Sequence, residues 1–544
     1  MYDLLTLGLG IALQIAPAQL FPSVVVGSLR HSEDERARER PPPKMTGPSL
    51  KKLTQEQFDA AVDDMMDGLG LEPEEAIESA VEEFEMQGYT LDGIIKEVGG
   101  ANKLKELPTA VAAEALKEET AREGRTVDSV RTSVLGLKSA LDEAASGDNE
   151  SQLLLASAKS DGVESLFSAC DFAEAKEDKE LLVTSLETLK RQLESDCARD
   201  HFVESEGPRR MVRLLETWKA PEDEAGAALV LKISALSMKE QEEGKCGYMS
   251  EGLPTVLASY LEGESTEAKT LEACCSCVQG ILTTDDTRPT PLALEAKFGG
   301  EFMKALSMDK DGVAVGLMVS FRRRLQRLGA AATATDQGTG AVDVSEERGV
   351  LRDLAVALRK ISLNDDICKK FVEEHDLIRA FLSILKTTAQ GKVKAKDLTM
   401  SILALLKQIS ACDTVKKNLV ESEAIEIAIE MFDEYEDNTI VIQSLLYILT
   451  NITLRNPDVA EHFADSGGFD FVLKFIARYL DKPKLMKQVC MFLRTAAVRS
   501  DKVKTLLRKA EMEKHVRAIQ SQHQKTCSDV ASAALRDMGI DNYN

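Results

Sequence analysis

The sequence predicts an all-α fold: an α-α superhelix, or solenoid, with a small helical extension at its N-terminus. A chain of 544 residues is too long for one compact core unless it is a repeat array that grows in one dimension. Its 17 Met, 17 Phe and single Trp suit helix-on-helix packing better than a β-sandwich. A third observation, internal periodicity, gives the strongest support.

One short pattern recurs, in which a helix ends at a small or acidic turn and a second apolar helix follows. The turns are marked by Ser160, Ser205, Ser250, Glu374, Ser422 and Ser466. Their spacings are 45, 45, 124, 48 and 44 residues, and the long spacing leaves room for roughly two more repeats.

A second pattern lies in the next helix, which comes after the turn and the apolar second helix. Four leucines align in it with separations of 48, 43 and 44 residues: Leu358, Leu406, Leu449 and Leu493. Two independent markers with one period indicate a tandem array, in which each unit buries its apolar face against its neighbours.

We expect five segments along the chain. In order they are a disordered or targeting extension (1–44), an acidic helical N-terminal unit (45–98), a linker with the first helices (99–150), the repeat solenoid (151–535) with an inserted loop (about 329–345), and a disordered tail (536–544). Within the second segment, Thr54 and Gln57 form a capping box, and Pro73 opens a second helix.

The first 44 residues allow two interpretations. The stretch 4–29 is nearly uncharged and contains Ala16-Pro17-Ala18, which has the form of a signal-peptide cleavage site. It lacks a positively charged start, and two prolines break it. We therefore interpret Met45 as a true or alternative initiator, preceded by a targeting extension or a gene-model artefact. A mature chain that starts near Gln19 would instead indicate export.

Charge and cysteine usage limit the classes of function. A net charge of -24 argues against a nucleic-acid binder, which needs a basic face. Ten scattered cysteines form no disulfide framework, so we expect a reducing compartment: the cytoplasm, with the nucleus as the alternative. Cys274, Cys275 and Cys277 lack a second ligand pair, so they are predicted to be core residues and not a zinc site.

No sequence motif of catalysis is present. The chain has no phosphate-binding loop, no G-x-S-x-G elbow and no H-E-x-x-H helix, and its six histidines are dispersed. We expect no catalytic residues, no cofactor and no metal. A cluster of arginines (Arg322, Arg323, Arg324 and Arg327) is interpreted as a solvated helix face, with a nuclear localisation signal or an anion contact as the alternatives.

The period and the turn of the form (E/D)-S-(E/G)-G resemble the armadillo repeat over about residues 155–535. The segments that begin at Thr54 and Pro73 are similar to the N-terminal region of the armadillo repeat-containing protein six family. The resemblance implies that the third helix of each repeat lines a concave groove. In peptide-binding members an Asn of that helix holds the partner's backbone, and a Trp one turn earlier packs its side chains.

The column of this sequence that corresponds to the Asn, two residues after the aligned leucine, contains Lys360, Gln408, Asn451 and Thr495. Only Asn451 fits, and the sole Trp, Trp218, lies elsewhere. A receptor of the nuclear-import type is therefore disfavoured. The candidate groove residues are these four and Arg494. A basic patch follows them: Arg499, Lys502, Lys504, Arg508 and Lys509.

The sequence thus predicts a non-enzymatic scaffold or adaptor that binds protein partners along the groove. We expect a monomer without nucleic-acid or membrane partners. Two alternatives stay open: a chaperone-like cofactor that clamps a folded client, and an unrecognised helical-repeat enzyme. Turnover of a substrate that is lost when one histidine is mutated would favour the enzyme.

The charge distribution generates a testable prediction. Residues 45–150 hold 24 acidic and 10 basic residues, whereas residues 478–525 hold 13 basic and 4 acidic residues. We expect the acidic segment around residues 72–85 to dock onto the basic C-terminal repeats until a partner displaces it. Deleting residues 45–100 should then change partner affinity and its salt dependence; unchanged values would refute this self-masking.

Overall fold

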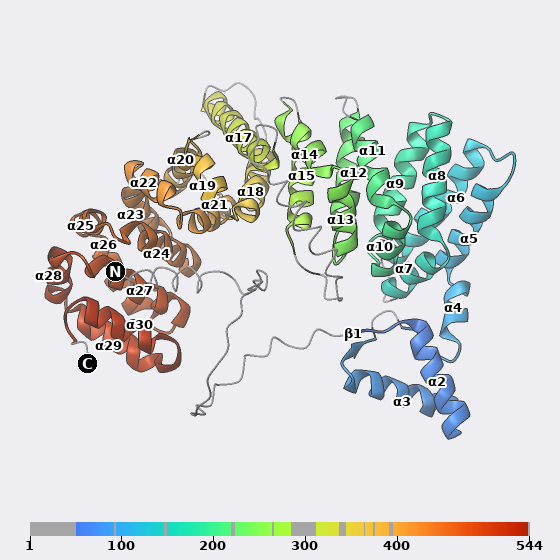
Figure 1. Ribbon diagram of the computed structural model, residues 1–544, viewed down its shortest axis with the longest axis horizontal. Coiled ribbons are helices and arrows are strands. Elements are labelled where there is room, and N and C mark those ends of the chain that lie inside the picture. The colour runs from blue at the N-terminus through green and yellow to red at the C-terminus, as the bar shows by residue number, and fades with distance from the viewer. Residues whose placement is uncertain are drawn as a thin grey trace, which may run out of the picture. The chain divides into compact units, whose positions relative to one another are not determined.

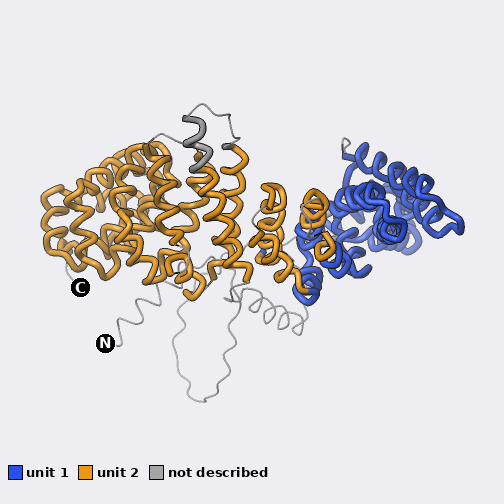
Figure 2. Tube along the Cα trace, turned by 90° about the horizontal axis from the view of Figure 1, so that it is seen from above, with its two compact units in different colours: residues 1–214, 232–251, 283–296 blue, residues 215–231, 252–282, 297–544 orange. Residues whose placement is uncertain are grey.

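The computed structural model describes most of the chain: residues 51–91, 94–145, 149–218, 223–263, 266–283, 285, 312–336, 344–363, 365–373, 376–390 and 395–541. The predicted extension at residues 1–44 lies outside them. Two compact units are present (Figure 2). Unit 1 comprises residues 1–214, 232–251 and 283–296, and unit 2 comprises residues 215–231, 252–282 and 297–544.

Unit 1 begins with a helical hairpin, formed by α2 (Gln55–Leu69) and α3 (Pro73–Met86). Thr54 and Gln57 exchange side-chain and backbone hydrogen bonds at the start of α2, which confirms the predicted capping box. Pro73 occupies the first turn of α3, where its missing N–H costs nothing. The two helix starts are therefore encoded locally.

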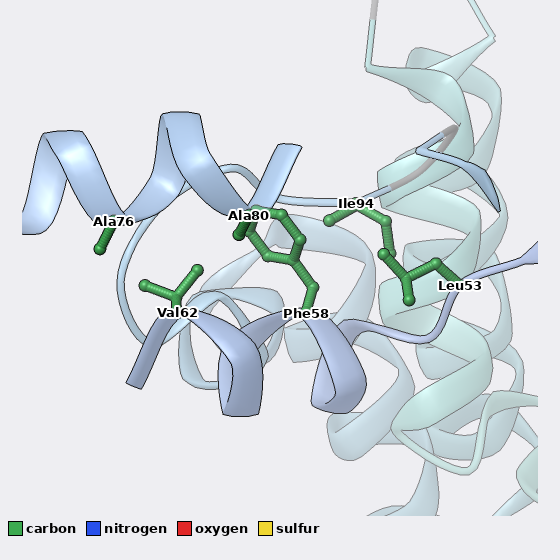
Figure 3. Packing of buried hydrophobic residues seen from close by; sticks show 6 residues of the cluster. All are labelled: Leu53, Phe58, Val62, Ala76, Ala80 and Ile94. Atoms are coloured by element: carbon green, nitrogen blue, oxygen red, sulfur yellow. The ribbon is translucent and has the colours of Figure 1, made fainter. Parts of the chain in front are cut away.

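The hairpin has a small core of its own, to which both helices and the flanking segments contribute. Its buried side chains are Leu53, Phe58, Val62, Ala76, Ala80 and Ile94 (Figure 3). Beside it, the parallel strands β1 (Lys51–Lys52) and β2 (Tyr89–Thr90) pair Lys51 with Tyr89 and Lys52 with Thr90. Alanines on α3 allow close approach of α2.

A buried glutamine joins this hairpin to the next part of unit 1. The Gln55 side chain accepts a hydrogen bond from the Ile95 amide at 2.7 Å and donates one to the Ile95 carbonyl at 3.0 Å. Asp59 accepts a hydrogen bond from the Ala101 amide at 2.8 Å. Both backbone groups of Ile95 are thus satisfied by one side chain, as burial of a loop requires.

Three kinds of helix alternate along the rest of the described chain (Figure 1). The first helices are α7 (Glu150–Lys159), α10 (Asp196–Glu204), α13 (Glu242–Ser250), α19 (Asp365–Glu373), α22 (Asp413–Glu421), α25 (Pro457–Asp465) and α28 (Asp501–Lys509). The second helices are α8 (Gly162–Ala175), α11 (Gly207–Thr217), α14 (Leu253–Glu262), α17 (Val313–Asp336), α20 (Leu377–Ala389), α23 (Ala424–Glu434), α26 (Gly468–Tyr479) and α29 (Met512–Gln522). The third helices are α9 (Lys179–Gln192), α12 (Glu224–Ser237), α15 (Ala268–Ile281), α18 (Val344–Ile361), α21 (Lys396–Ile409), α24 (Thr439–Thr453), α27 (Pro483–Ala497) and α30 (Gln524–Asp537).

Helices of one kind from neighbouring repeats pack side by side within unit 2. The third helices form a continuous row, with α18 between α15 and α21, α24 between α21 and α27, and α30 against α27. The four aligned leucines lie in this row and are at most 1% exposed. The all-α solenoid is therefore confirmed, and the shared apolar column is what stacks the repeats.

The turn between the first and second helices has one backbone conformation throughout. One residue there has a positive φ: Asp161, Glu206, Gly252, Asp376, Glu423, Gly467 or Glu511. A glycine follows this residue in three repeats, and it has another cause. A Cβ at Gly162 would collide with Ser157. A Cβ at Gly207 or Gly468 would collide with the ring of the preceding Phe202 or Phe463. The S-E-G and S-G-G turns therefore combine a left-handed residue with a close helix contact.

The structure differs from the predicted linker at residues 99–150. Helices α4 (Gly100–Glu106), α5 (Pro108–Ala121) and α6 (Val127–Ala144) pack on α7, α8 and α9 respectively, as one more repeat would. The buried positions of α5 include Ala110 and Ala113, so its apolar face is small and gives a weak sequence signal.

Two further predicted segments also differ. Within the expected loop 329–345, α17 continues to Asp336, because its alanines favour helix, and residues 337–343 lie outside the described part. At the tail, α30 runs to Asp537, and Arg508 donates to the carbonyls of Met538 and Gly539 at 3.1 and 2.8 Å. These contacts order residues 536–541, which were expected to be disordered.

The turn conformation generates a stability prediction. Replacing Gly467, whose φ is 74°, by alanine should lower the free energy of unfolding by about 1 kcal/mol, because a Cβ is strained in the left-handed region. Space is not the obstacle, since the nearest atom to such a Cβ is 3.8 Å away. Urea unfolding of the full chain measures the change.

The matched control is Gly349→Ala, the same substitution inside helix α18. A Cβ at Gly349 meets only ordinary contacts, so this variant should gain about 1 kcal/mol from helix propensity. If both substitutions changed the free energy of unfolding equally and in the same direction, backbone conformation would not control the turn.

Candidate partner-binding site

The open face of the third helices in unit 2 is the candidate site. Relative to each buried leucine, positions six and two before it and one and two after it share one helix face. We call these residues the third-helix strip: Arg352, Val356, Arg359, Lys360, Met400, Ala404, Lys407, Gln408, Gln443, Tyr447, Thr450, Asn451, Lys487, Met491, Arg494 and Thr495. All except Thr450 and Asn451 are half-buried or exposed.

The structure places the five predicted groove residues together in this strip. Lys360 lies on α18, Gln408 on α21, Asn451 on α24, and Arg494 and Thr495 on α27. These helices are consecutive neighbours in the packed row. Whether a partner uses them stays a prediction.

Three of these residues hydrogen-bond to the preceding third helix or the turn after it. Gln408 donates to the Ser362 carbonyl at 3.3 Å, and Asn451 donates to the Ser410 hydroxyl at 2.8 Å. The hydroxyls of Thr495 and Thr453 are 3.2 Å apart. Asn451 is only 8% exposed, so its side chain links two repeats. The column therefore contributes to stacking in addition to lining the face.

The charge of the strip has one sign. It contains six cations and no carboxylate: Arg352, Arg359, Lys360, Lys407, Lys487 and Arg494. Asp353 pairs with Arg352, and Asp537 pairs with Arg494, each at 2.8 Å. Within the described residues, Arg359, Lys360 and Lys487 have no ion pair. The strip therefore keeps positive charge available to a partner.

An aromatic side chain occupies the centre of the strip, a feature that the sequence analysis missed. Tyr447 lies one turn before Asn451, and the Lys407 ammonium lies 5.2 Å from its ring centroid. Burial raises the pKa of Tyr447 to about 12, so its phenol is neutral at physiological pH. The sequence analysis considered only Trp at this position and therefore missed the tyrosine. The signal was present, because Tyr447 lies four residues before Asn451.

The predicted basic patch is separate from the strip. Four of its five residues lie on the first helix α28, and Arg499 lies just before that helix. Lys502 pairs with Asp465 at 2.7 Å, and Lys504 pairs with Asp501 at 3.2 Å. Arg508 binds the carbonyls of the C-terminal turn. Arg499 and Lys509 make no ion pair in the described part of the chain. Much of this charge is thus internally compensated, and the predicted docking of residues 72–85 here stays a prediction.

The arginine cluster of α17 includes structural residues. Arg324 is only 4% exposed and pairs with Glu347 at 2.8 Å. Arg323 donates to the carbonyls of Glu262 and Gly263. The interpretation as a solvated helix face is therefore wrong for Arg324, because the neighbouring helix supplies a half-buried carboxylate that sequence spacing does not reveal.

Among the described residues there is neither a metal-binding cluster nor a helix that could span a membrane. No group of three His, Cys, Asp or Glu side chains there could hold a metal ion. No described helix is both long and apolar enough to cross a membrane.

Comparisons with known proteins agree with the fold. Residues 50–122 match the family model of the armadillo repeat-containing protein 6 N-terminal domain. Armadillo repeat-containing protein 6 of Pongo abelii is 22% identical over 420 residues, and that of Homo sapiens is 21% identical over 425 residues; each alignment covers 75% of both chains. A solved engineered protein shares the fold, with a TM-score of 0.57 at 16% identity over 89% of this chain and 96% of its own.

The link between Asn451 and Ser410 generates a prediction. Asn451→Ala should lower the free energy of unfolding by about 1 kcal/mol, because a buried hydrogen bond between repeats is lost. In a double-mutant cycle with Ser410→Ala, a coupling of about 1 kcal/mol is expected from urea unfolding.

Gln443→Ala is the control, since Gln443 is half-buried on the same face of the same helix and makes no hydrogen bond in the described residues. The free energy of unfolding of this variant should equal that of the natural chain. Strict additivity of the Asn451 and Ser410 substitutions would contradict a direct link.

Proposed function

We propose that the chain, which is similar to armadillo repeat-containing protein 6, is a non-enzymatic protein-interaction scaffold whose third-helix strip binds an extended acidic segment of a protein partner. The single observation that carries this proposal is the charge of the strip. Six cations lie on it without a carboxylate, although the whole chain has a net charge of -24.

Electrostatics explains why this contrast matters for recognition. The positive strip attracts acidic segments, whereas the net negative charge of the whole chain repels other copies of the same chain. Lys407, whose ammonium lies over Tyr447, is held at the centre of the strip. The central helix α24 has no charged residue, so an apolar side chain of the partner can pack there between two cationic helices.

The spacing of the third helices supports an extended partner. Packed helices lie about 8–10 Å apart, and an extended chain advances about 3.3 Å per residue. About every third partner residue would therefore meet a new third helix. Along the column two residues before each leucine, these contacts would be Val356, Ala404, Tyr447 and Met491, all half-buried.

Recognition would depend on side chains more than on a backbone amide ladder. The Asn451 amide donates to Ser410, and the Gln408 amide donates to the Ser362 carbonyl. These amides are already engaged within the solenoid, which leaves Tyr447 and the cations without an ion pair among the described residues, Arg359, Lys360, Lys407 and Lys487, to contact a partner. Charge and apolar contacts then set partner choice.

A second candidate, a chaperone-like cofactor that clamps a folded client, is favoured by the N-terminal hairpin. Such a cofactor needs a separate docking segment, and α2 and α3 have a core of their own. Near their ends, Leu69 is 72% exposed and Met86 is 82% exposed. Residues 53–95 contain 13 acidic residues and no basic residue, so this segment would suit a basic surface.

A charge-reversal experiment tests the primary proposal. The probe is a fluorescently labelled peptide in which Asp or Glu alternates with Leu or Phe, and binding is followed by anisotropy. Lys407→Glu combined with Lys487→Glu should weaken binding by roughly tenfold or more, because two attractions become repulsions. Affinity of the natural chain should also fall as salt is added.

The control reverses two cations of the first helices, Lys417→Glu with Lys509→Glu. It changes net charge by the same amount and includes one residue of the basic patch. Its affinity should stay within about twofold of that of the natural chain. Equal losses in both double variants would indicate attraction by net charge alone and would refute the strip as the binding site.

A further inference from the structure

Helix α3 of the N-terminal hairpin carries negative charge that the hairpin does not compensate. Its 14 residues include six glutamates and no basic residue. All six glutamates are exposed. Within the described residues none of them is in an ion pair, and only Glu83 accepts a side-chain hydrogen bond, from Gln87 at 2.8 Å.

Carboxylates of the solenoid repeats are treated differently. On α8, Asp171 pairs with Arg210 and Glu174 pairs with Arg213, each at 2.6 Å, and both arginines come from α11 of the next repeat. Pairs of this kind join further repeats, for example Lys386 with a carboxylate at 3.1 Å. Pairing between neighbouring helices thus neutralises charge along the solenoid, and α3 departs from this arrangement.

The glutamates of α3 also lie where they disfavour their own helix. Glu78 and Glu82 are four residues apart, a spacing at which like charges repel each other. Glu83 and Glu85 occupy the last turn, where the helix dipole favours cations, and no basic residue is present there. Local costs that a fold leaves uncompensated are expected at functional sites. The cost on α3 is one that bound positive charge would remove.

The charge borders an apolar edge of the same helix. Ala76 and Ala80 face α2 in the hairpin core (Figure 3). The opposite side of α3, which we call the acidic face of α3, follows from the helix period and consists of Glu74, Glu78, Val81 and Glu85. Ile77 lies at its edge, and Ile77 and Val81 are only half-buried. Apolar and acidic side chains therefore lie next to each other on one exposed surface.

This surface is left uncovered by the packing of the hairpin. Helix α3 packs mainly against α2 and β2. In the solenoid, by contrast, a third helix packs against each second helix, as α9 does on α8 and α18 does on α17. The half-buried apolar edge of α3 thus has room for a further helix beside it.

We propose that the acidic face of α3 binds a basic amphipathic helix of a protein partner. The apolar side of that helix would pack on Ile77 and Val81, as in other complexes of a helix with an apolar groove. Its Lys or Arg side chains would pair with the glutamates and remove their mutual repulsion. This proposal does not depend on the third-helix strip, and it holds whether or not the chain clamps a client.

Charge selects this occupant over two others. A nucleic acid is repelled, because residues 53–95 contain 13 acidic and no basic residues. A second copy of the chain would bring the same acidic hairpin and a net charge of -24. A basic helix alone supplies both the positive charge and the apolar surface that the acidic face of α3 lacks.

A binding experiment with the full-length chain tests the proposal. The probe is a fluorescently labelled peptide of about 20 residues, with Leu on one helix face and Lys on the other, and anisotropy reports its binding. Glu78→Lys combined with Glu85→Lys should weaken binding by roughly tenfold or more. The control reverses two exposed carboxylates of the solenoid, Glu216→Lys with Glu251→Lys, and should stay within about twofold of the natural chain. Equal losses in both double variants would overturn the proposal.

Stability separates a binding role from a structural one. Glu78→Lys with Glu85→Lys removes like-charge repulsion and puts a cation in the last turn, so the urea midpoint of the chain should be unchanged or higher. A lower midpoint, or loss of helix by circular dichroism, would show that these glutamates support the fold and would overturn the proposal. The neutral pair Glu78→Gln with Glu85→Gln should weaken peptide binding in the same direction, and unchanged binding would contradict it.

Two further measurements test the helical character and the independence of the site. A peptide of the same composition, scrambled so that Leu and Lys no longer segregate, should bind roughly tenfold more weakly. Equal binding would show attraction by net charge alone and would overturn the proposal. Lys407→Glu with Lys487→Glu, the strip variant, should leave binding of the helical peptide unchanged, so failure of the strip and failure of this site are distinguishable.

The remaining occupants have their own outcomes. If the basic C-terminal repeats of the chain cover the acidic face of α3, Arg499→Glu with Lys509→Glu should raise peptide affinity, and the face would be assigned to them in place of a partner. A dimer in sedimentation that dissociates in Glu78→Lys with Glu85→Lys would identify a second copy as the occupant. We expect neither: peptide affinity should be unchanged in the first case, and the chain should sediment as a monomer in the second.

Discussion

The structure depends on one constraint: a single three-helix repeat has an apolar face that it cannot bury alone. The third helices answer this constraint by placing a leucine column, Leu358 to Leu493, at the contacts between neighbours. Burial of this kind is non-directional, so it permits stacking without defining the register of the repeats. Register comes from directional contacts, among them Asn451 with Ser410 and Thr495 with Thr453. Apolar burial thus stabilises the stack, and hydrogen bonds between repeats define its register.

This division explains why the strip can carry function. The buried side of each third helix is committed to packing, and the turn between the first and second helices requires the left-handed residue and, at Gly207 and Gly468, the close contact. The outward positions two and six residues before the leucine are needed neither for this packing nor for the turn conformation. Arg352, Met400 and Lys487 could therefore be replaced without loss of the stack, and their charge and shape are free to suit a partner.

Much of the fold could be predicted because its signals are local and repeated. The capping box at Thr54, the leucine column and the turn markers depend on neighbouring residues, and two of the three share one period. The repeat at residues 100–144 was not predicted, because Ala110 and Ala113 give α5 a small apolar face with a weak sequence signal. The partners of Arg324 and Asn451 could not be predicted, since Glu347 and Ser410 are brought to them by packing between helices.

A repeat array also makes departures from its own pattern interpretable. At one column Val356, Ala404 and Met491 are aliphatic, so Tyr447 stands out as the residue that brings a ring and a cation together. Stacking imposes the same structural demands on corresponding positions. A residue that breaks the pattern without serving the stack is therefore best explained by chemistry outside it.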